Sequence, residues 1–317
     1  MISQSNVNKS RACIGISIPC FNEESNIIPL VNSIEELFNS KLSNYDYLIQ
    51  FIDNKSTDLT REKIMEACDN NPHVCAIFNI KNFGFQSGYY GFTKAQGDCV
   101  ITMAADLQEP VSTLPKLIRE WEQGAKVVCA VKSDSQEGLI MKNLRKIYYK
   151  ILKTGSSSDI IENFSGFGLY DRDFIKVLNS LEEPVPFMRT LVAEFGYDIA
   201  IVYYDQERRK SGKSKNTLSS LYGIAIRSFT NSTRLGMRFA FFLGAFSTCV
   251  GLIMAIIALI SSIFEGIVIN FDPAFVAIVF FGGIQICLVA LIGEYLAIIN
   301  KRLMKRPLVV EEKRINR

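Results

Sequence analysis

Four short polar clusters, each directly after an apolar run, contain the side chains best suited to chemistry. They cover residues 19–24, 53–58, 81–84 and 105–110. Carboxylates, amides and a lysine can hydrogen-bond a nucleotide base, bind a hard cation or neutralise phosphate. One such cluster fits an ordinary turn, whereas four in succession favour a ligand-binding cleft.

The apolar runs before these clusters are expected to be strands of an α/β fold. Strands are predicted over residues 13–18, 47–52, 74–79, 99–103 and 126–131. Between them, residues 27–38 have helical spacing of apolar side chains, and a second helix is predicted over 58–68 with a Thr57/Asp58 cap. This alternation predicts βαβ units and a mostly parallel, Rossmann-like sheet. Ligands bind such sheets at the carboxyl ends of the strands, where the clusters lie.

Two long apolar stretches near the C-terminus predict a membrane hairpin. Residues 239–264 comprise 26 residues without a charge, and 275–293 comprise 19, with the apolar run continuing to 299. A membrane-spanning helix needs about 20 such residues. Two buried helices of a soluble core are the alternative.

The basic residues around these stretches predict their orientation. Net charge is only +3, but residues 205–238 contain eight Lys and Arg, residues 300–317 contain seven, and 265–274 contain none. The positive-inside rule then places the catalytic domain and both termini in the cytoplasm, with the bacterial inner membrane as the expected location.

Three regions follow from these patterns. Residues 1–216 are expected to form the catalytic domain, 217–238 an amphipathic interfacial helix, and 239–317 a transmembrane hairpin with a basic tail. A plain surface helix is the alternative for 217–238.

Three further patterns argue against a zinc site, a secretory signal and a nucleic-acid partner. The eight cysteines form no C-x-x-C pair, and His73 is the only histidine. The first dozen residues are mostly polar, which excludes a secretory signal there. Because the basic residues flank apolar stretches, we expect no nucleic-acid partner.

The ordered motifs resemble those of family-two glycosyltransferases of the GT-A fold. The series is P-x-F-N-E at 19–23, D-N-x-S-x-D at 53–58, K-N-x-G at 81–84, A-x-D-L-Q-x-P at 104–110 and R-x-x-G-x-S-K at 209–215. With the hairpin, it resembles the polyprenyl-phosphate branch, which includes dolichyl-phosphate mannose synthase and bactoprenol glucosyltransferase. The resemblance implies transfer of glucose or a related hexose from a UDP-linked sugar to polyprenyl phosphate, with inversion, for a cell-surface glycan. It also implies a homo-oligomer.

The first three clusters are expected to bind the nucleotide-sugar donor. Asp53 or Asn54 can accept a hydrogen bond from a pyrimidine N–H, and Phe21 can pack beside the base. For Asp53, the alternative is that it only closes a strand-end turn. The expected donor-binding residues are Pro19, Phe21, Asn22, Glu23, Asp53, Asn54, Lys81, Gly84, Gln86, Ala105 and Asp106.

Asp106 is the expected ligand of a divalent cation. Mg²⁺ or Mn²⁺ takes oxygen ligands and would stabilise the departing nucleotide diphosphate. Gln108 can add its amide oxygen, as the family's D-L-Q pattern implies. Where the family has the first acid of D-x-D, this chain has Ala104.

A phosphate acceptor explains why no catalytic histidine is found. Its second pKa is about 6, so the attacking oxygen is already anionic at neutral pH. Arg209, Ser214 and Lys215 are expected to bind phosphate, with catalytic roles for Arg209 and Lys215 beside Asp106. Arg145 and Lys146 are further candidates. A basic loop attracted only to anionic lipids is the alternative for 209–215.

Two other functions fit parts of the pattern. A polysaccharide synthase is one, although two helices cannot enclose a growing polymer. A catalytically weakened membrane protein that only binds nucleotide-sugars is the other, motivated by Ala104. Where relatives carry an acid and an arginine, this chain has Gly166 and Gly168.

Overall fold

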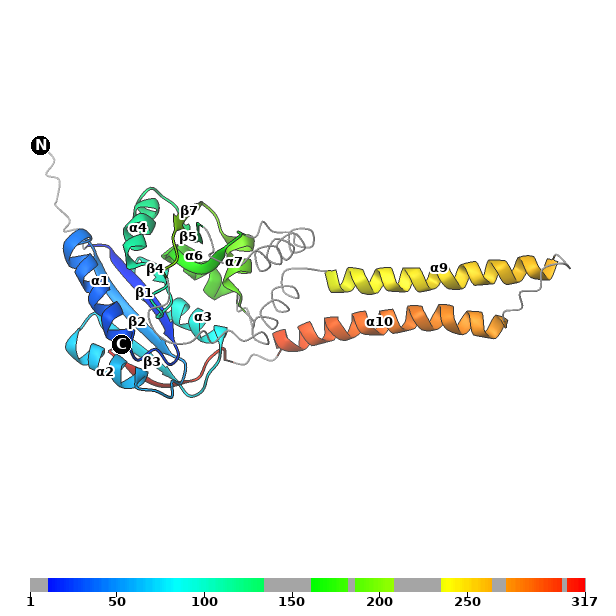
Figure 1. Cartoon of the computed structure of the whole chain (residues 1–317), viewed down its shortest axis with the longest axis horizontal. Helices are drawn as coiled ribbons and strands as arrows, with labels where there is room; N and C mark the ends of the chain where they lie inside the picture. The colour runs from blue at the N-terminus through cyan, green and yellow to red at the C-terminus, as the bar shows by residue number, and fades with distance from the viewer. Residues whose placement is uncertain are drawn as a thin grey trace, which may run out of the picture. The chain divides into compact units, whose positions relative to one another are not determined.

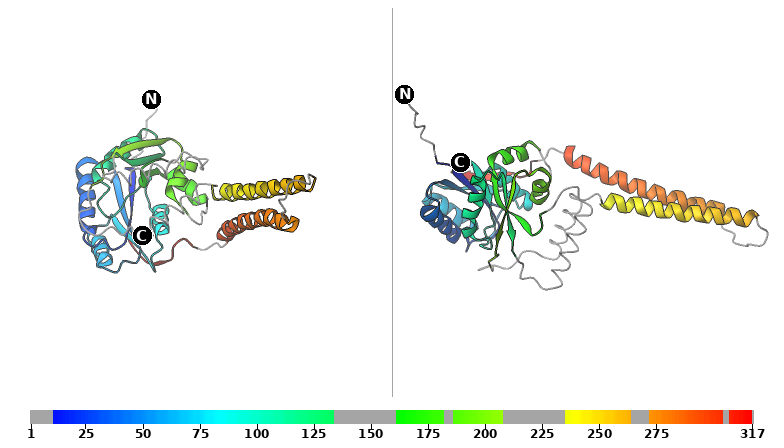
Figure 2. Two further views of the ribbon diagram at one scale, coloured as in Figure 1. Left: turned by 45° about the vertical axis from the view of Figure 1, so that its right-hand side comes forward. Right: turned by 90° about the horizontal axis from the view of Figure 1, so that it is seen from above.

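The computed structural model describes residues 11–133, 161–181, 186–207, 235–263, 272–303 and 307–316. The chain divides into two compact units. The first holds an eight-stranded sheet and its helices, and the second holds two long helices. Figure 1 and Figure 2 draw both units.

The sheet has the strand order β7-β5-β6-β4-β1-β2-β3-β8. Its strands are β1 (Cys13–Cys20), β2 (Asp46–Asp53), β3 (Val74–Asn79), β4 (Cys99–Thr102), β5 (Val127–Lys132), β6 (Phe164–Asp171), β7 (Ile199–Tyr204) and β8 (Glu311–Ile315). The five strands predicted from the sequence are therefore confirmed, with ends shifted by up to two residues.

Four neighbouring strands, β4-β1-β2-β3, run parallel. In their register, Cys20 pairs with Asp53 and Ser17 with Thr102, so the strands end at one edge of the sheet. β6 is antiparallel to both β4 and β5, and β8 is antiparallel to β3. The fold is thus an α/β unit with a mixed sheet whose central strands are parallel, as predicted.

Helices cover both faces of this sheet (Figure 1). They are α1 (Ile27–Lys41), α2 (Thr60–Asn70), α3 (Phe85–Lys94), a 3-10 turn η1 (Val111–Thr113), α4 (Leu114–Glu122), α6 (Arg172–Ser180) and α7 (Met188–Phe195). Residues from α1, α2 and α4 share one buried cluster with the sheet, and residues from α3, α6 and α7 share the other. The sheet separates the two clusters because successive strand side chains point to opposite faces.

The two predicted helices form, with one correction at a cap. In α1 the apolar positions 27, 30, 31, 34, 37 and 38 are all buried, as their spacing predicts. α2 begins at Thr60, two residues later than expected, and Leu59 is its N-cap, with no side-chain hydrogen bond. The Asp58 carboxylate still accepts the Thr60 N–H at 3.0 Å. Asp58 therefore lies in the turn before α2 and accepts a hydrogen bond from the first residue of the helix.

The second unit contains α9 (Leu235–Ile263) and α10 (Pro273–Leu303). The helices approach closely at two glycines: a Cβ at Gly251 would lie 2.6 Å from Phe280 Cβ, and one at Gly283 would lie 2.0 Å from Ser247 Oγ. Counting only the described residues, no helix is both long and apolar enough to cross a membrane. The predicted interfacial helix 217–238 lies outside the described residues, apart from its last four, which begin α9.

The end of the chain differs from the prediction. The residues after 299 were expected to be a basic tail of the hairpin, yet Glu311–Ile315 form β8 at the edge of the sheet. Arg306–Arg317 belong to the first compact unit. Charged side chains are compatible with an edge strand because one side of it faces solvent.

Candidate active site

The first two polar clusters are joined by hydrogen bonds between their loops. The Asn22 N–H donates to Ser56 Oγ at 2.9 Å, and the Thr57 N–H donates to Asn22 Oδ1 at 2.8 Å. The Glu23 N–H donates to Thr60 Oγ1 at 2.7 Å. The ends of β1 and β2 therefore form one continuous surface, as expected for neighbouring parallel strands.

Asn54 joins the second cluster to the third. Its Nδ2 donates to Asn82 Oδ1 at 2.9 Å, and its Oδ1 accepts the Phe83 N–H at 2.8 Å. The side chain is buried, and Asn79 Nδ2 lies 3.4 Å from the same oxygen. Because both the oxygen and the nitrogen of its side-chain amide are hydrogen-bonded, Asn54 fixes the 81–84 loop against the end of β2.

Asp53 closes the turn after β2. Its carboxylate has no exposed surface and accepts the Lys55 N–H at 3.2 Å and the Ser56 N–H at 3.1 Å. Arg61 Nε donates to the same carboxylate at 2.7 Å. These contacts fit the turn-closing alternative, and a contact between Asp53 and a nucleotide base stays a prediction.

The fourth cluster is tied to β6 through Glu109. Glu109 Oε2 accepts the Ala104 N–H at 2.7 Å, and Ser165 Oγ donates to Oε1 at 3.2 Å. Burial, opposed by the Ala104 hydrogen bond, raises the pKa of Glu109 to about 7. Glu109 is not among the residues predicted from the sequence, because it stands at the variable position of D-L-Q-x-P. The signal that could have identified it is an acidic side chain in the same loop as Ala104, where the family has an acid.

Each of the four loops contains one residue with a positive φ. These residues are Asn22 (54°), Lys55 (64°), Gly84 (60°) and Leu107 (58°). For a side chain such as Leu107, this conformation is strained by about 1–2 kcal/mol. Glycine adopts a positive φ without strain and asparagine tolerates it, so the strained positions are Lys55 and Leu107, at the ends of β2 and β4.

The oxygen ligands near Asp106 fit a hard divalent cation. Asp106 is half-buried, and its Oδ1 accepts the main-chain N–H of Gln108 at 3.2 Å. The side-chain amide of Gln108 takes no part in that hydrogen bond. Asp106 and Glu109 supply carboxylates and Gln108 an amide oxygen, the donors that Mg²⁺ and Mn²⁺ accept. Within the described ranges, no group of three or more His, Cys, Asp or Glu side chains is placed to hold a metal.

The remaining donor candidates lie on the same edge. Phe21 and Gln86 are half-buried, Ala105 is buried, and Lys81 is exposed with Nζ 5.2 Å from the Phe83 ring centre. Pro19 faces α3, where a Cβ at Gly88 would lie 3.5 Å from Pro19 Cγ. The acceptor candidates fall outside the described residues: Arg145, Lys146, Arg209, Ser214 and Lys215.

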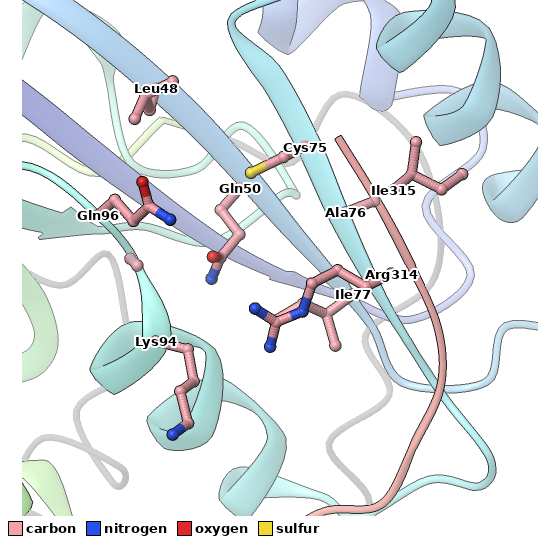
Figure 3. A pocket seen from close by; sticks show the side chains of 10 residues that line it. Leu48, Gln50, Cys75, Ala76, Ile77, Lys94, Gln96, Arg314 and Ile315 are labelled. Carbon is pink, nitrogen blue, oxygen red and sulfur yellow. The ribbon is translucent and has the colours of Figure 1, made fainter. Parts of the chain in front are cut away.

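A small pocket lies elsewhere, between the sheet and the end of α3 (Figure 3). It is lined by Leu48, Gln50, Cys75, Ala76, Ile77, Lys94, Ala95, Gln96, Arg314 and Ile315. None of the sequence-predicted site residues lines it. Gln50 Nε2 donates to Gly91 O at 2.7 Å, so Gln50 serves helix packing there.

Sequence comparison identifies a family for this arrangement. The family profile "Glycosyl transferase family 2" matches residues 16–178. That range contains all four polar clusters, the Asn54 contacts and Glu109. The match therefore covers the donor and metal candidates and about half of the chain, whereas Arg209, Ser214 and Lys215 lie beyond it.

Individual relatives are similar over nearly the whole chain. CsbB of Bacillus subtilis is 30% identical over 296 residues, which are 93% of this chain and 89% of CsbB. The bactoprenol glucosyl transferase of Shigella phage SfII is 28% identical over 303 residues, covering 95% of this chain and 97% of the phage protein. Among solved structures, glucosyl-3-phosphoglycerate synthase of M. tuberculosis has a TM-score of 0.46 at 17% identity, covering 69% of this chain and 78% of that one.

Proposed function

Since the chain belongs to glycosyl transferase family 2 and is a glycosyltransferase, we propose that it transfers glucose or a related hexose from a UDP-linked sugar to polyprenyl phosphate. The product is a lipid-linked sugar, formed with inversion, that serves a cell-surface glycan.

One observation carries this proposal. The similarity to a bactoprenol glucosyl transferase covers 97% of that protein, so it includes both the catalytic half and the two long helices. A protein similar only in its nucleotide-binding half would not share the C-terminal helices. The acceptor class is therefore inferred from the helices and the substrate type from the strand-end clusters.

The donor lies across the joined loops of β1, β2 and β3. Asn54 holds the 81–84 loop in place, and the carboxylate of Asp53 keeps its turn closed, so the base meets a preformed surface. Phe21 packs beside the base, and Lys81 lies within reach of the diphosphate. A preformed site lowers the entropic cost of ordering side chains on binding.

The diphosphate leaves from the side of Asp106. Asp106, Gln108 and Glu109 would hold Mg²⁺ or Mn²⁺, which supplies positive charge to the leaving group when bound. Asp106 orients the Gln108 main chain through its 3.2 Å hydrogen bond. Glu109 ties the 104–110 loop to β6 through its contacts with the Ala104 N–H and Ser165 Oγ.

The acceptor needs no general base. A phosphate monoester is anionic at neutral pH, and its oxygen attacks the anomeric carbon directly. Arg209 and Lys215 bind the phosphate and Ser214 donates a hydrogen bond to it, with Arg145 and Lys146 as additional cations. These roles rest on the resemblance of 209–215 to the family's R-x-x-G-x-S-K.

The two long helices anchor the enzyme to the membrane that contains the acceptor. Large apolar side chains of α9 and α10 are exposed, among them Phe242, Phe246, Leu259, Ile278, Phe281 and Leu288. A bilayer would cover such surfaces. The uncharged stretches 239–264 and 275–293 are long enough to span it. Copies of the chain associate through these helices.

The test is sugar transfer by membranes that contain the full chain. Radiolabelled UDP-glucose and a panel of other nucleotide-sugars are offered with polyprenyl phosphate, with Mg²⁺, Mn²⁺ or a chelator. Label in the lipid phase, lost on chelation, is expected. Nucleotide binding without transfer from any donor would contradict the proposal.

The second candidate is the nucleotide-sugar-binding protein without efficient catalysis, and Ala104 favours it. Its N–H is already taken by Glu109, so a carboxylate stands beside the position of the missing acid. If Glu109 replaces that acid, Ala104→Asp gives no gain in turnover. A large gain would identify a weakened site.

A further inference from the structure

The C-terminal strand β8 brings acidic side chains to the donor side of the sheet. β8 pairs with β3, with Asn79 opposite Glu311 and Phe78 opposite Lys313. Figure 1 draws the red C-terminal segment beside β3, in agreement with this pairing. The strand begins eight residues after α10 ends at Leu303, so the next element along the chain after the second long helix is a strand of the sheet.

Glu312 contacts two cations that belong to the β2 end of the site. Its Oε2 lies 2.8 Å from Lys55 Nζ and 3.1 Å from Arg61 Nη2. Lys55 has a φ of 64°, and its N–H is bound by Asp53. Glu312 therefore holds the side chain of the strained residue within the turn that is expected to meet the base.

Arg61 transmits this contact to the buried carboxylate. Its Nε donates to Asp53 at 2.7 Å, and its Nη2 donates to Asn79 O at 3.2 Å. The guanidinium also lies 5.1 Å from the centre of the Phe78 ring. Glu312 completes the set of contacts that fixes Arg61, and Arg61 fixes the turn from its buried side.

We propose that Glu312 is a positioning residue for the nucleotide donor, acting through Arg61 and Lys55 on the turn of residues 53–56. This role rests on the proposed function, because it assumes that the turn binds the donor. The sequence predicts a basic tail that belongs to the membrane hairpin, and neither the family profile nor the motif series includes residue 312.

The effect is specific to the donor. The contacts of Glu312 lead to Lys55, Arg61 and Asp53, and none of its described contacts reaches the 104–110 loop or β6. A loosened turn weakens binding of the nucleotide, whereas the acceptor phosphate and the transfer step do not depend on it. The change is therefore confined to the Michaelis constant for the nucleotide-sugar.

The experiment compares the full-length wild type with Glu312→Gln in detergent or membranes. For Glu312→Gln, we expect the Michaelis constant for the nucleotide-sugar and the Kd for UDP to rise about threefold to tenfold, the range for losing charge-assisted contacts of a half-exposed group. The Michaelis constant for polyprenyl phosphate and kcat are expected to be unchanged. Lys55→Gln, which removes the same ion pair from the other side, is expected to shift the same two quantities.

The matched control is Lys313→Gln on the same strand. Lys313 is exposed and has no ion pair among the described residues. Its neutralisation is expected to leave UDP binding unchanged. Equal UDP binding by wild type and Glu312→Gln would overturn the positioning role alone, and so would equal losses for donor and acceptor. A wild type that binds no nucleotide would overturn the proposed function as well.

Discussion

Asp106 carries the sharpest prediction for a single side chain. Asp106→Asn keeps the size of the side chain and an oxygen that can accept the Gln108 N–H, so folding is expected to be preserved. Without its negative charge, the side chain would bind the divalent cation near the leaving diphosphate less tightly. Transfer is expected to fall at least about 100-fold, as for removal of one electrostatic contact to a transition state. Initial rates across a Mn²⁺ titration measure this, and full activity with unchanged metal dependence would remove Asp106 from the site.

Ionisation of Glu109 is expected to lower the free energy of unfolding at neutral and higher pH. Its folded pKa of about 7 lies above the ordinary 4.5, because burial disfavours the charge. Between these values the folded state binds more protons than the unfolded state, so the free energy of unfolding falls as pH rises. The loss, complete above pH 7, amounts to about 1–3 kcal/mol.

Glu109→Gln removes this pH dependence. At pH 8 in chelator, its free energy of unfolding is expected to exceed the wild-type value by about 1–3 kcal/mol, and at pH 4.5 the two should agree. Transfer activity should fall at the same time. Denaturant unfolding at both pH values measures the difference, with Glu36→Gln on the exposed face of α1 as control. A variant no more stable than wild type at pH 8 would contradict the raised pKa of the Glu109 carboxyl.

At the scale of elements, helix α3 packs closely on β2 at one glycine. A Cβ at Gly91 would lie 2.1 Å from Ile52 Cγ1, whereas a Cβ at Gly88, one turn earlier, would meet Pro19 at 3.5 Å. Gly91→Ala is therefore expected to lower the free energy of unfolding by about 1–3 kcal/mol through overpacking. Gly88→Ala should be neutral or gain up to about 1 kcal/mol from helix propensity. Thermal unfolding of the two variants side by side measures this, and equal Tm values would contradict the close packing.

The elements differ in how far the sequence predicts them. β1 to β5 and α1 are visible because each is a continuous apolar run or a regular apolar face. β6 contains Gly166 and Gly168 and has no clear alternation, and Gly168 is required where a Cβ would lie 2.3 Å from Val128 O. β8, with sequence EEKRI, becomes a strand only through pairing with β3, a contact across more than 230 residues.

In the candidate site too, the sequence predicts local features but not contacts between distant segments. The alternation of strands and helices placed the four clusters at one edge, since the carboxyl ends of parallel strands lie on the same side of a sheet. The roles of Glu109 and Glu312 depend on which loops approach one another, and no local spacing encodes that. Asp53 illustrates the reverse case: its position was expected, but the sequence left open whether it serves the base or the turn, and its burial favours the turn.

For the whole molecule, the position of β8 constrains any membrane topology. β1 to β7 precede the two long helices and β8 follows them, yet all belong to one sheet. If α9 crosses a membrane, α10 must cross back, because a single crossing would leave β8 on the opposite side from β3. The same arrangement is predicted independently by the two uncharged stretches and by the Lys and Arg residues that flank them, which place both ends of the hairpin on one side.

A protease site inserted at residues 265–274 is expected to be cleaved in spheroplasts, and one added after Arg317 only in inverted membrane vesicles, because β8 keeps the C-terminus on the catalytic side. Cleavage after Arg317 in spheroplasts would mean a single crossing and would contradict the pairing of β8 with β3. Protection of both sites in spheroplasts would place the helices on the cytoplasmic side without spanning. In that case the anchoring would depend on the exposed apolar faces of α9 and α10 lying along the membrane surface.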